Sequence, residues 1–445
     1  MRPALGSAPD RAPTRAGRGA AALRHSNFRL FFFGQLISLV GTWMQSLAQG
    51  WLILQLTNDP FALGVIAAVQ FVPVLVFGLF GGLIADALPK RETIVVTQTS
   101  AMLLALALWV LTATHTVEAW HVAVLAFLLG CVNAVDMPAR QAFVVEMVGR
   151  EDVLNAVALN SAAFNTARIV GPAIAGIAIG AVGIAACFLL NGVSYLAVIA
   201  GLLAMRRAEL RPLGGYRMGR GAAAVASDLA EGLRYVRRTP VVLLAVVVVG
   251  FVSTLGMNLN VLVPVLADTG LHVGAEGFGF LMAATGIGSL LSALTIAIAG
   301  RTSPRVLLAG AGMLGFLEAV LLVVQSLPIA LVCMFGVGFG AIAMTATANT
   351  SIQLAVPDAL RGRVLSVYTT VFAGSTPVGA LIAGTLAAGF GAQFAFFVGG
   401  VTSLAVVLIA AVLARPAPPA SPPLPHARDE HEPGERQADP RGVHP

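Results

Sequence analysis

The chain has 445 residues, of which 57% are hydrophobic and 11% are charged, and its formal net charge is +6. A water-soluble domain carries roughly a quarter charged residues, so this composition excludes an ordinary soluble globule. The positive charge is interpreted as a signal that orients the chain in a bilayer, and no nucleic-acid partner is expected. The three cysteines lie in apolar runs without metal-ligand spacing, so they predict neither a metal site nor a disulfide.

The two ends of the chain differ from the rest. Residues 1–26 are rich in Ala, Arg, Pro and Gly and contain no apolar run, which argues against a cleaved signal peptide. Residues 415–445 are rich in proline and charge. Both segments are predicted to be disordered tails.

Between the tails, twelve segments each supply the roughly 20 mostly apolar residues that a membrane-spanning helix needs. They lie at residues 28–54, 61–86, 93–114, 119–141, 153–180, 183–205, 240–267, 277–299, 306–325, 328–353, 363–388 and 391–414. The fold class is therefore predicted to be an all-α membrane protein with twelve transmembrane helices, located in the cell membrane.

Basic residues occur in every second connection between these segments. One set of connections carries Lys90 and Arg91, Arg150, the cluster within 206–238, Arg301 and Arg305, and Arg361 and Arg363, whereas the alternate set carries none. Cytoplasmic loops are enriched in Lys and Arg, so both termini are predicted to be cytoplasmic.

The two halves of the chain share a repeat. Gly171–Gly176 (GPAIAG) matches Gly379–Gly384 (GALIAG), and at the same offset Gly183 matches Gly391. This repeat predicts two parallel six-helix halves, with the working site at their interface near the bilayer midplane.

The halves are expected at residues 27–205 and 240–414. The connection 206–239 should join them and contain an interfacial helix, because Leu229, Leu233 and Val236 share one helical face.

Two motifs resemble those of a known family. Gly82, three residues, Asp86 and then the basic pair Lys90-Arg91 resemble the signature loop of the major facilitator superfamily. Gly171-Pro172 with Gly176 resembles its antiporter motif. Further segments resemble sequences of one branch of this superfamily, which holds enterobactin exporters and macrolide efflux pumps. These segments are Asn27–Phe31, Gly34-Gln35, Gly41–Gln45, Gly50-Trp51, Asn133-Ala134, Pro138–Arg140 and Arg168–Pro172.

The resemblance covers about residues 24–414, with departures. Ala87 and Pro89 stand where the signature loop usually has a basic residue and a glycine, and the equivalent loop of the second half keeps only Arg301 and Arg305. This puts loop gating in the second half in doubt.

The resemblance implies roles for both motifs. Asp86 would act as a latch facing the start of the eleventh span near Arg363, and the alternative is a topology signal with no moving part. Gly171, Pro172 and Gly176 would bend the fifth span to seal the pathway, and the alternative is tight helix packing.

Three charged residues lie deep in the apolar segments, Asp136, Arg168 and Glu318, and Arg140 lies at the end of one such segment. Asp136 and Arg140 are four residues apart on one helical face, so they can pair locally. The Arg168 side chain could also reach Asp136, which predicts either a switchable, proton-sensitive pair or a permanent salt bridge. Glu318 is a further candidate for proton coupling. The alternative is that it is an uncharged or hydrogen-bonded structural acid.

Polar residues within the spans predict an inward-facing cavity wall. In the first span Ser38, Thr42, Gln45 and Gln49 share a face, with Trp43 nearby. Further candidates are Asn133, Thr254, Met257, Asn258, Thr345 and Asn349. Such a cavity suits amphipathic organic substrates; the alternative is hydrogen bonding between helices.

No phosphate-binding loop, zinc-protease motif, nucleophile elbow or metal cluster occurs in the sequence. The chain is therefore expected to be neither an enzyme nor ATP-driven, and to need no cofactor. The predicted function is export of a small amphipathic molecule, a drug or siderophore-like metabolite, by proton antiport. The alternatives are an importer or facilitator of the same fold and a non-transporting membrane scaffold or sensor.

Overall fold

A computed structural model of the protein describes the backbone of residues 21–211, 222–299 and 303–413. Within these ranges, the side chains of residues 79–86, 222–226, 228, 358 and 359 are not described. The described residues contain helices and connections but no strand. Residues 1–20 and the predicted tail 415–445 lie outside the description.

The helices of the N-terminal part are η1 (Ala21–Arg24), α2 (Ser26–Thr57), α3 (Pro60–Ala87), α4 (Lys90–Ala113), α5 (Ala119–Val182), α6 (Ile184–Ala204) and η2 (Arg207–Glu209). Those of the C-terminal part are α7 (Ala222–Arg238), α8 (Pro240–Gly256), α9 (Leu259–Val265), η3 (Leu266–Gly270), α10 (Gly274–Ala299), α11 (Pro304–Val320), η4 (Leu321–Val323), α12 (Leu327–Ala355), α13 (Asp358–Phe390) and α14 (Ala392–Leu413).

Eleven helices within the described residues are long and apolar enough to cross a membrane. Many of their large apolar side chains are exposed, for example Val96 (64%), Ile298 (85%) and Val412 (72%). A soluble protein rarely exposes so much apolar surface, whereas hydrocarbon solvates it. The chain is therefore a multi-pass membrane protein.

Helix α5 has 64 residues and contains two of the predicted spans. At 1.5 Å per residue it would measure about 96 Å if straight, about three times the hydrocarbon thickness. It changes direction at Gly149, whose φ of 75° is a conformation that glycine adopts without strain. The predicted spans left residues 142–152 as a connection. In the structure these residues are helical, and the helix is interrupted only at Gly149.

The predicted span 240–267 is not continuous. Helix α8 ends at Gly256 and α9 begins at Leu259, with Met257 and Asn258 between them. The side-chain nitrogen of Asn258 donates to the carbonyl of Thr254 at 2.7 Å, so it satisfies a backbone acceptor that the break leaves free.

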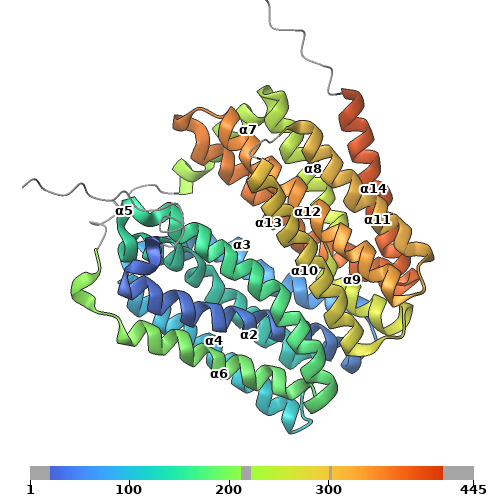
Figure 1. The fold of residues 1–445 in the computed structure, drawn as a ribbon, viewed down its shortest axis with the longest axis horizontal. Helices are drawn as coiled ribbons and strands as arrows, with labels where there is room; N and C mark the ends of the chain where they lie inside the picture. The colour runs from blue at the N-terminus through green and yellow to red at the C-terminus, as the bar shows by residue number, and fades with distance from the viewer. Residues whose placement is uncertain (1–20, 212–221, 300–302, 414–445) are drawn as a thin grey trace, which may run out of the picture.

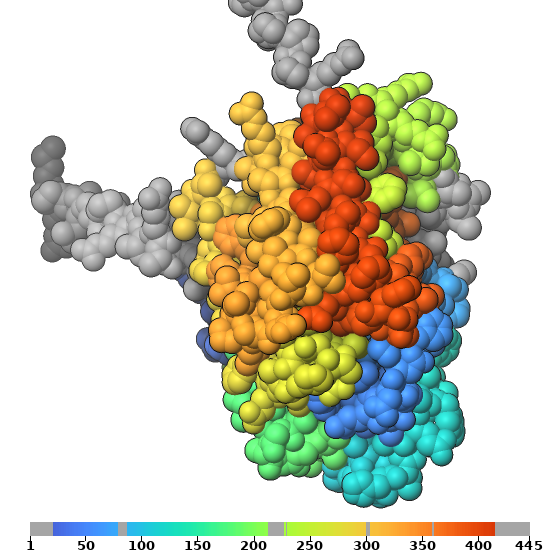
Figure 2. Space-filling view, turned by 90° about the vertical axis from the view of Figure 1, so that its right-hand side faces the viewer, coloured from blue at the N-terminus to red at the C-terminus, as the bar shows by residue number. Residues whose placement is uncertain are grey.

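The helices pack in two groups (Figure 1). Helices α2 to α6 contact chiefly one another, and so do α8 and α10 to α14. The most extensive contacts between the groups are those of α5 with α10 and of α3 with α13. Figure 2 shows the yellow residues around the start of α10 lying between the orange and red helices and the blue N-terminal helices.

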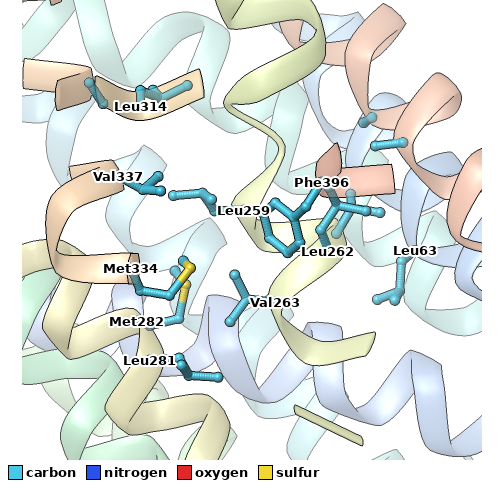
Figure 3. Close-up of a cluster of buried hydrophobic side chains, with 14 of the residues drawn as sticks. Leu63, Leu259, Leu262, Val263, Leu281, Met282, Leu314, Met334, Val337 and Phe396 are labelled. Atoms are coloured by element: carbon cyan, nitrogen blue, oxygen red, sulfur yellow. The ribbon is translucent and has the colours of Figure 1, made fainter. Parts of the chain in front are cut away.

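The short helix α9 lies at the centre of a buried apolar cluster (Figure 3). Its residues Leu259, Leu262 and Val263 lie between methionines of α10 and α12 on one side and Phe396 of α14 and Leu63 of α3 on the other. This cluster packs the broken span against both groups.

The glycines of the sequence repeat make equivalent contacts. A β-carbon added at Gly171 would meet α2, and one at Gly176 would meet α10; one at Gly379 would meet α8, and one at Gly384 would meet α3. In each case the nearest atom would lie within 3.0 Å. Gly183 and Gly391, which end α5 and α13, have φ of 85° and 86°. The residues that match in sequence therefore also match in conformation and packing.

The predicted interfacial helix corresponds to α7. Val236 is 1% exposed, whereas Leu229 and Leu233 stay 39% and 41% exposed, so one of the three apolar positions packs against the bundle. Glu231 pairs with Arg363 Nη1 at 2.5 Å, which attaches α7 to α13.

A polar cluster holds the start of α2 against η2. The side chain of Asn27 donates to the carbonyl of Arg206 at 3.0 Å and accepts from its amide at 2.9 Å. Hydrogen bonds from the Ser26 hydroxyl and from Arg206 lower the pKa of Glu209. This cluster joins the two ends of the N-terminal group.

The closest helix contact suggests a stability test. A β-carbon at Gly288 of α10 would lie 1.9 Å from the Phe335 carbonyl oxygen of α12. We expect Gly288→Ala to lower the free energy of unfolding by about 1–3 kcal/mol, because the backbones must separate. Gly374→Ala in α13, which would meet nothing within 4 Å, is the matched control. Thermal denaturation in detergent measures both, and equal stability of the two variants would contradict the packing described.

Candidate functional site

Three of the four charged candidates lie on α5 and the fourth lies on α11. Asp136 and Arg140 precede the change of direction at Gly149, and Arg168 follows it. Glu318 lies near the end of α11, in the other group of helices.

Asp136 is buried and its carboxylate has several donors. Oδ1 accepts from the Thr97 hydroxyl at 2.5 Å and from Gln98 Nε2 at 3.0 Å, and both donors lie on α4. Oδ2 accepts from Arg140 Nε at 2.5 Å. The local pair with Arg140 is thus present, and this network joins α4 to α5. Arg168 is not part of it, so the contact between Asp136 and Arg168 is not formed in this structure.

Arg168 instead lies over an aromatic ring. Its guanidinium carbon is 5.8 Å from the centre of the Trp43 ring of α2, a cation–π geometry. Trp43 also contacts Phe164 edge to face, with ring centres 5.5 Å apart. Among the described residues Arg168 has no hydrogen bond and no ion pair, and it is half-buried.

The antiporter motif places Trp43 at this position. A β-carbon at Gly171 would lie 2.6 Å from Trp43 Cβ and 2.8 Å from the Val40 carbonyl, so only glycine lets α2 approach α5 this closely. Gly176 makes the same kind of contact with Gly279 of α10, and Pro172 lies inside the helix. The motif therefore packs α5 against both α2 and α10.

Glu318 is fully buried, and neither carboxylate oxygen has a hydrogen-bond partner. Oε2 would lie 3.0 Å from a β-carbon at Gly256, the last residue of α8, and 3.4 Å from one at Gly399 of α14. Two glycines thus leave room for this carboxyl group beside the break between α8 and α9.

The polar residues of α2 divide into different environments. Gln45 accepts from Asn191 Nδ2 of α6 at 2.6 Å, and Ser38 is also buried. Thr42 donates to the Ser38 carbonyl within the helix. Gln49 lines a cavity of about 110 Å³ together with Gln70 of α3 and Asn260 of α9.

Of the four polar residues of α2, Gln49 lines this cavity. Sequence analysis did not select Asn191, Gln70 and Asn260. It selected Gln45 because Gln45 is a polar residue within an apolar segment, and the same criterion applies to these three residues.

The other cavity candidates mostly bond within their own helices. Thr254 donates to the Gly250 carbonyl, Thr345 donates to the Ala341 carbonyl, and Asn349 accepts from Gln353. Met257 accepts from the Ser253 hydroxyl at 3.4 Å, beside the helix break. Asn133 is half-buried on α5.

The signature loop is only partly described. The side chain of Asp86 lies outside the described residues, so the proposed latch stays a prediction. Lys90 Nζ donates to the Leu88 carbonyl at 3.5 Å. Arg91 is buried, and it donates to the carbonyls of Leu202 and Leu203 at 2.7 and 3.2 Å. In this structure Arg91 therefore caps the end of α6.

A cavity of about 520 Å³ lies at the start of α2, lined in part by Arg24, His25, Arg206 and Arg211. His25 Nε2 lies 2.8 Å from Asp152 Oδ2, a contact to which sequence analysis assigned no role. The deep charged residues do not line this cavity. The described residues also contain no cluster of His, Cys, Asp and Glu that could hold a metal ion.

Comparison with known proteins agrees with a membrane transporter. A family model described as "Transmembrane secretion effector" matches residues 18–435. The multidrug efflux pump Tap of Mycolicibacterium fortuitum is 30% identical over 401 residues, covering 87% of this chain and 95% of Tap. The staphyloferrin A transporter of Staphylococcus aureus is 25% identical over 397 residues, covering 86% and 94%.

Solved structures share the fold at low identity. The nucleoside transporter NupG superposes with a TM-score of 0.70 at 9% identity, covering 89% of this chain and 100% of NupG. A bacterial homologue of the lysosomal transporter Spinster, in an inward-facing and occupied conformation, gives 0.67 at 13% identity, covering 90% and 98%.

The network around Asp136 suggests a double-mutant cycle. We expect Asp136→Asn to lower the free energy of unfolding by about 3 kcal/mol, because Arg140 then keeps a buried charge without its counter-charge. Adding Arg140→Gln should restore part of this loss. Denaturation of the purified variants in detergent measures the coupling, and purely additive effects would contradict the pair.

Proposed function

Because the chain belongs to the transmembrane secretion effector family of major facilitator transporters, we propose that it exports a small amphipathic molecule, a drug or siderophore-like metabolite, in exchange for protons. The observation that carries the proton part is the burial of two acids, Asp136 and Glu318, within membrane-spanning helices. Intramembrane acids are rare, and proton relays commonly use them. The efflux pump among the relatives supports the direction.

We also propose twelve spans in two six-helix halves, with both termini in the cytoplasm. The change of direction at Gly149 supports two spans within α5. The equivalent contacts of Gly171 with α2 and of Gly379 with α8 support an internal repeat. The basic residues of alternate connections support the orientation.

The contacts between the proposed halves support transport by alternating access. A β-carbon at Gly279 would lie 2.9 Å from Gly176 Cα, and one at Gly384 would lie 3.3 Å from Gly64 Cα. Both contacts lie toward the ends of α5 and α13 that the orientation makes extracellular. The conformation described is therefore closed on that side, and opening to the outside requires these contacts to separate.

Protonation would act on this equilibrium through α5. A proton on Asp136 removes the charge that holds Arg140, and it weakens the hydrogen bonds from Thr97 and Gln98. Asp136 and the residues that contact α10 lie on the same helix, on either side of Gly149. A change in the network can thus alter the angle between the two parts of α5.

Transport in vesicles tests the role of Asp136. Wild-type protein in proteoliposomes should accumulate an amphipathic fluorescent dye against its gradient when the lumen is acidified. Asp136→Asn should lose this accumulation by about a hundredfold, the lower end of the range for a lost acid–base group, yet still exchange dye at equal pH. Glu118→Gln, at an exposed acid, is the control. Unchanged accumulation by Asp136→Asn would exclude its proton role, and dye movement only with the opposite gradient would indicate import.

Glu318 gives a separate prediction. Glutamine keeps the size of the side chain but cannot release a proton, so Glu318→Gln should also lose gradient-driven accumulation while keeping equilibrium exchange. Thermal stability should be maintained, because the carboxyl group has no partner to lose. Normal pH-driven transport by Glu318→Gln would assign Glu318 a packing role and leave coupling to Asp136.

A further inference from the structure

We propose that Arg168, with Trp43 and Phe164, binds an anionic group of the substrate, so that the transported class is amphipathic molecules carrying a carboxylate or a similar anion. The inference rests on the proposed function and specifies its substrate. Its basis is a cation within the membrane-spanning helices that has no anion beside it among the described residues.

Asp136, the deep acid closest to Arg168 in sequence, already accepts hydrogen bonds from other residues. Both oxygens of Asp136 have donors, one of them Arg140, so that pair is neutral as a unit. Glu318 belongs to the other group of helices and lies against α8 and α14.

Among the described residues, helices α2 and α10, which pack on this part of α5, offer no other anion nearby. Helix α2 contains no Asp or Glu. Helix α10 contains Glu276, whose carboxylate lies beside Gly180 of α5. Gly180 is about 18 Å from Arg168 along the helix at 1.5 Å per residue. The acids Glu151 and Asp152 lie near the opposite end of this part of α5, and Asp152 contacts His25.

The geometry leaves the donors of Arg168 available. The guanidinium carbon lies 5.8 Å from the centre of the Trp43 ring, and its five N–H groups have no acceptor among the described residues. The edge that these groups form matches the two oxygens of a carboxylate. A bound anion would therefore supply the missing counter-charge without displacing the Trp43 ring.

The aromatic residues supply the apolar part of the site. Phe164 is 45% exposed and meets Trp43 edge to face. A substrate with an anionic group at Arg168 would place its apolar body along these rings. The site thus selects a molecule with both properties, and it disfavours cationic amphiphiles by charge repulsion.

The position also couples binding to the contact between the two groups of helices. A β-carbon at Gly286 of α10 would lie 2.6 Å from Ile169 Cγ1 and 3.4 Å from the Arg168 carbonyl. Arg168 therefore lies directly beside the contact of α5 with α10. An anion held there can respond when that contact opens.

A matched pair of probes tests the inference by binding. Purified protein in nanodiscs is titrated with 1-pyrenebutyric acid and with its uncharged methyl ester, and empty nanodiscs are subtracted. Wild type should bind the acid at least about tenfold more tightly than the ester, the lower range for a charge-assisted hydrogen bond. Arg168→Gln should remove this preference by weakening binding of the acid alone.

Two further variants complete the design. Arg168→Lys keeps the charge but not the planar donors, so it should keep only part of the preference. Arg305→Gln removes an exposed positive charge on α11 and should keep all of it. Equal affinity of wild type for acid and ester, or equal weakening of both by Arg168→Gln, would overturn the proposal and leave Arg168 a packing role.

Transport of the same pair separates this inference from the proposed function. If both hold, proteoliposomes accumulate the acid under a pH gradient, and Arg168→Gln loses this accumulation. Preferential binding of the acid without any accumulation would refute export and leave the anion site in place. Accumulation of the ester alone would support export and refute the anion site.

Discussion

The close packing of α5 against α2 and α10 is the contact on which the rest of the site depends. In a bilayer, apolar burial gives little driving force between helices, so association rests on close approach of backbones. Gly171 and Gly176 lie five residues apart on α5 and provide this approach to two different helices, α2 and α10. The first brings the Trp43 ring to Arg168, and the second joins the two groups of helices. A larger residue at either position would move the aromatic partner away from the cation or separate the groups.

The ionisable residues in the helices have three different environments. Asp136 has donors on both oxygens, Glu318 has none on either, and Arg168 has an aromatic face but no anion. A saturated network holds helices in place, whereas a group without partners acquires them from protons, water or ligand. This difference underlies the proposed division of labour, in which the acids respond to protons and Arg168 receives the substrate.

Much of the fold follows from local sequence rules. The apolar segments predict the helices because each must satisfy its backbone hydrogen bonds internally. Gly183 and Gly391 match by sequence offset and share the same positive φ, a conformation that favours glycine. Asp136 and Arg140 pair as their spacing predicts, because residues four apart meet on one helical face. The break at Met257 and Asn258 also has a local signal, because Gly256 ends α8 and Asn258 is the N-cap of α9, although one continuous span was predicted there.

The sequence by itself determined that the chain crosses the membrane many times, which segments form its helices, and that Asp136 and Glu318 lie within them, because these depend on composition and periodicity. The tertiary structure alone decided what those residues contact. Arg168 could reach Asp136 by helix length and spacing, yet it lies over Trp43, and Gln45 bonds to Asn191 where a cavity wall was expected. The physical reason is that a side chain's partner depends on the rotation and distance of the neighbouring helix, which close-packing glycines such as Gly171 set.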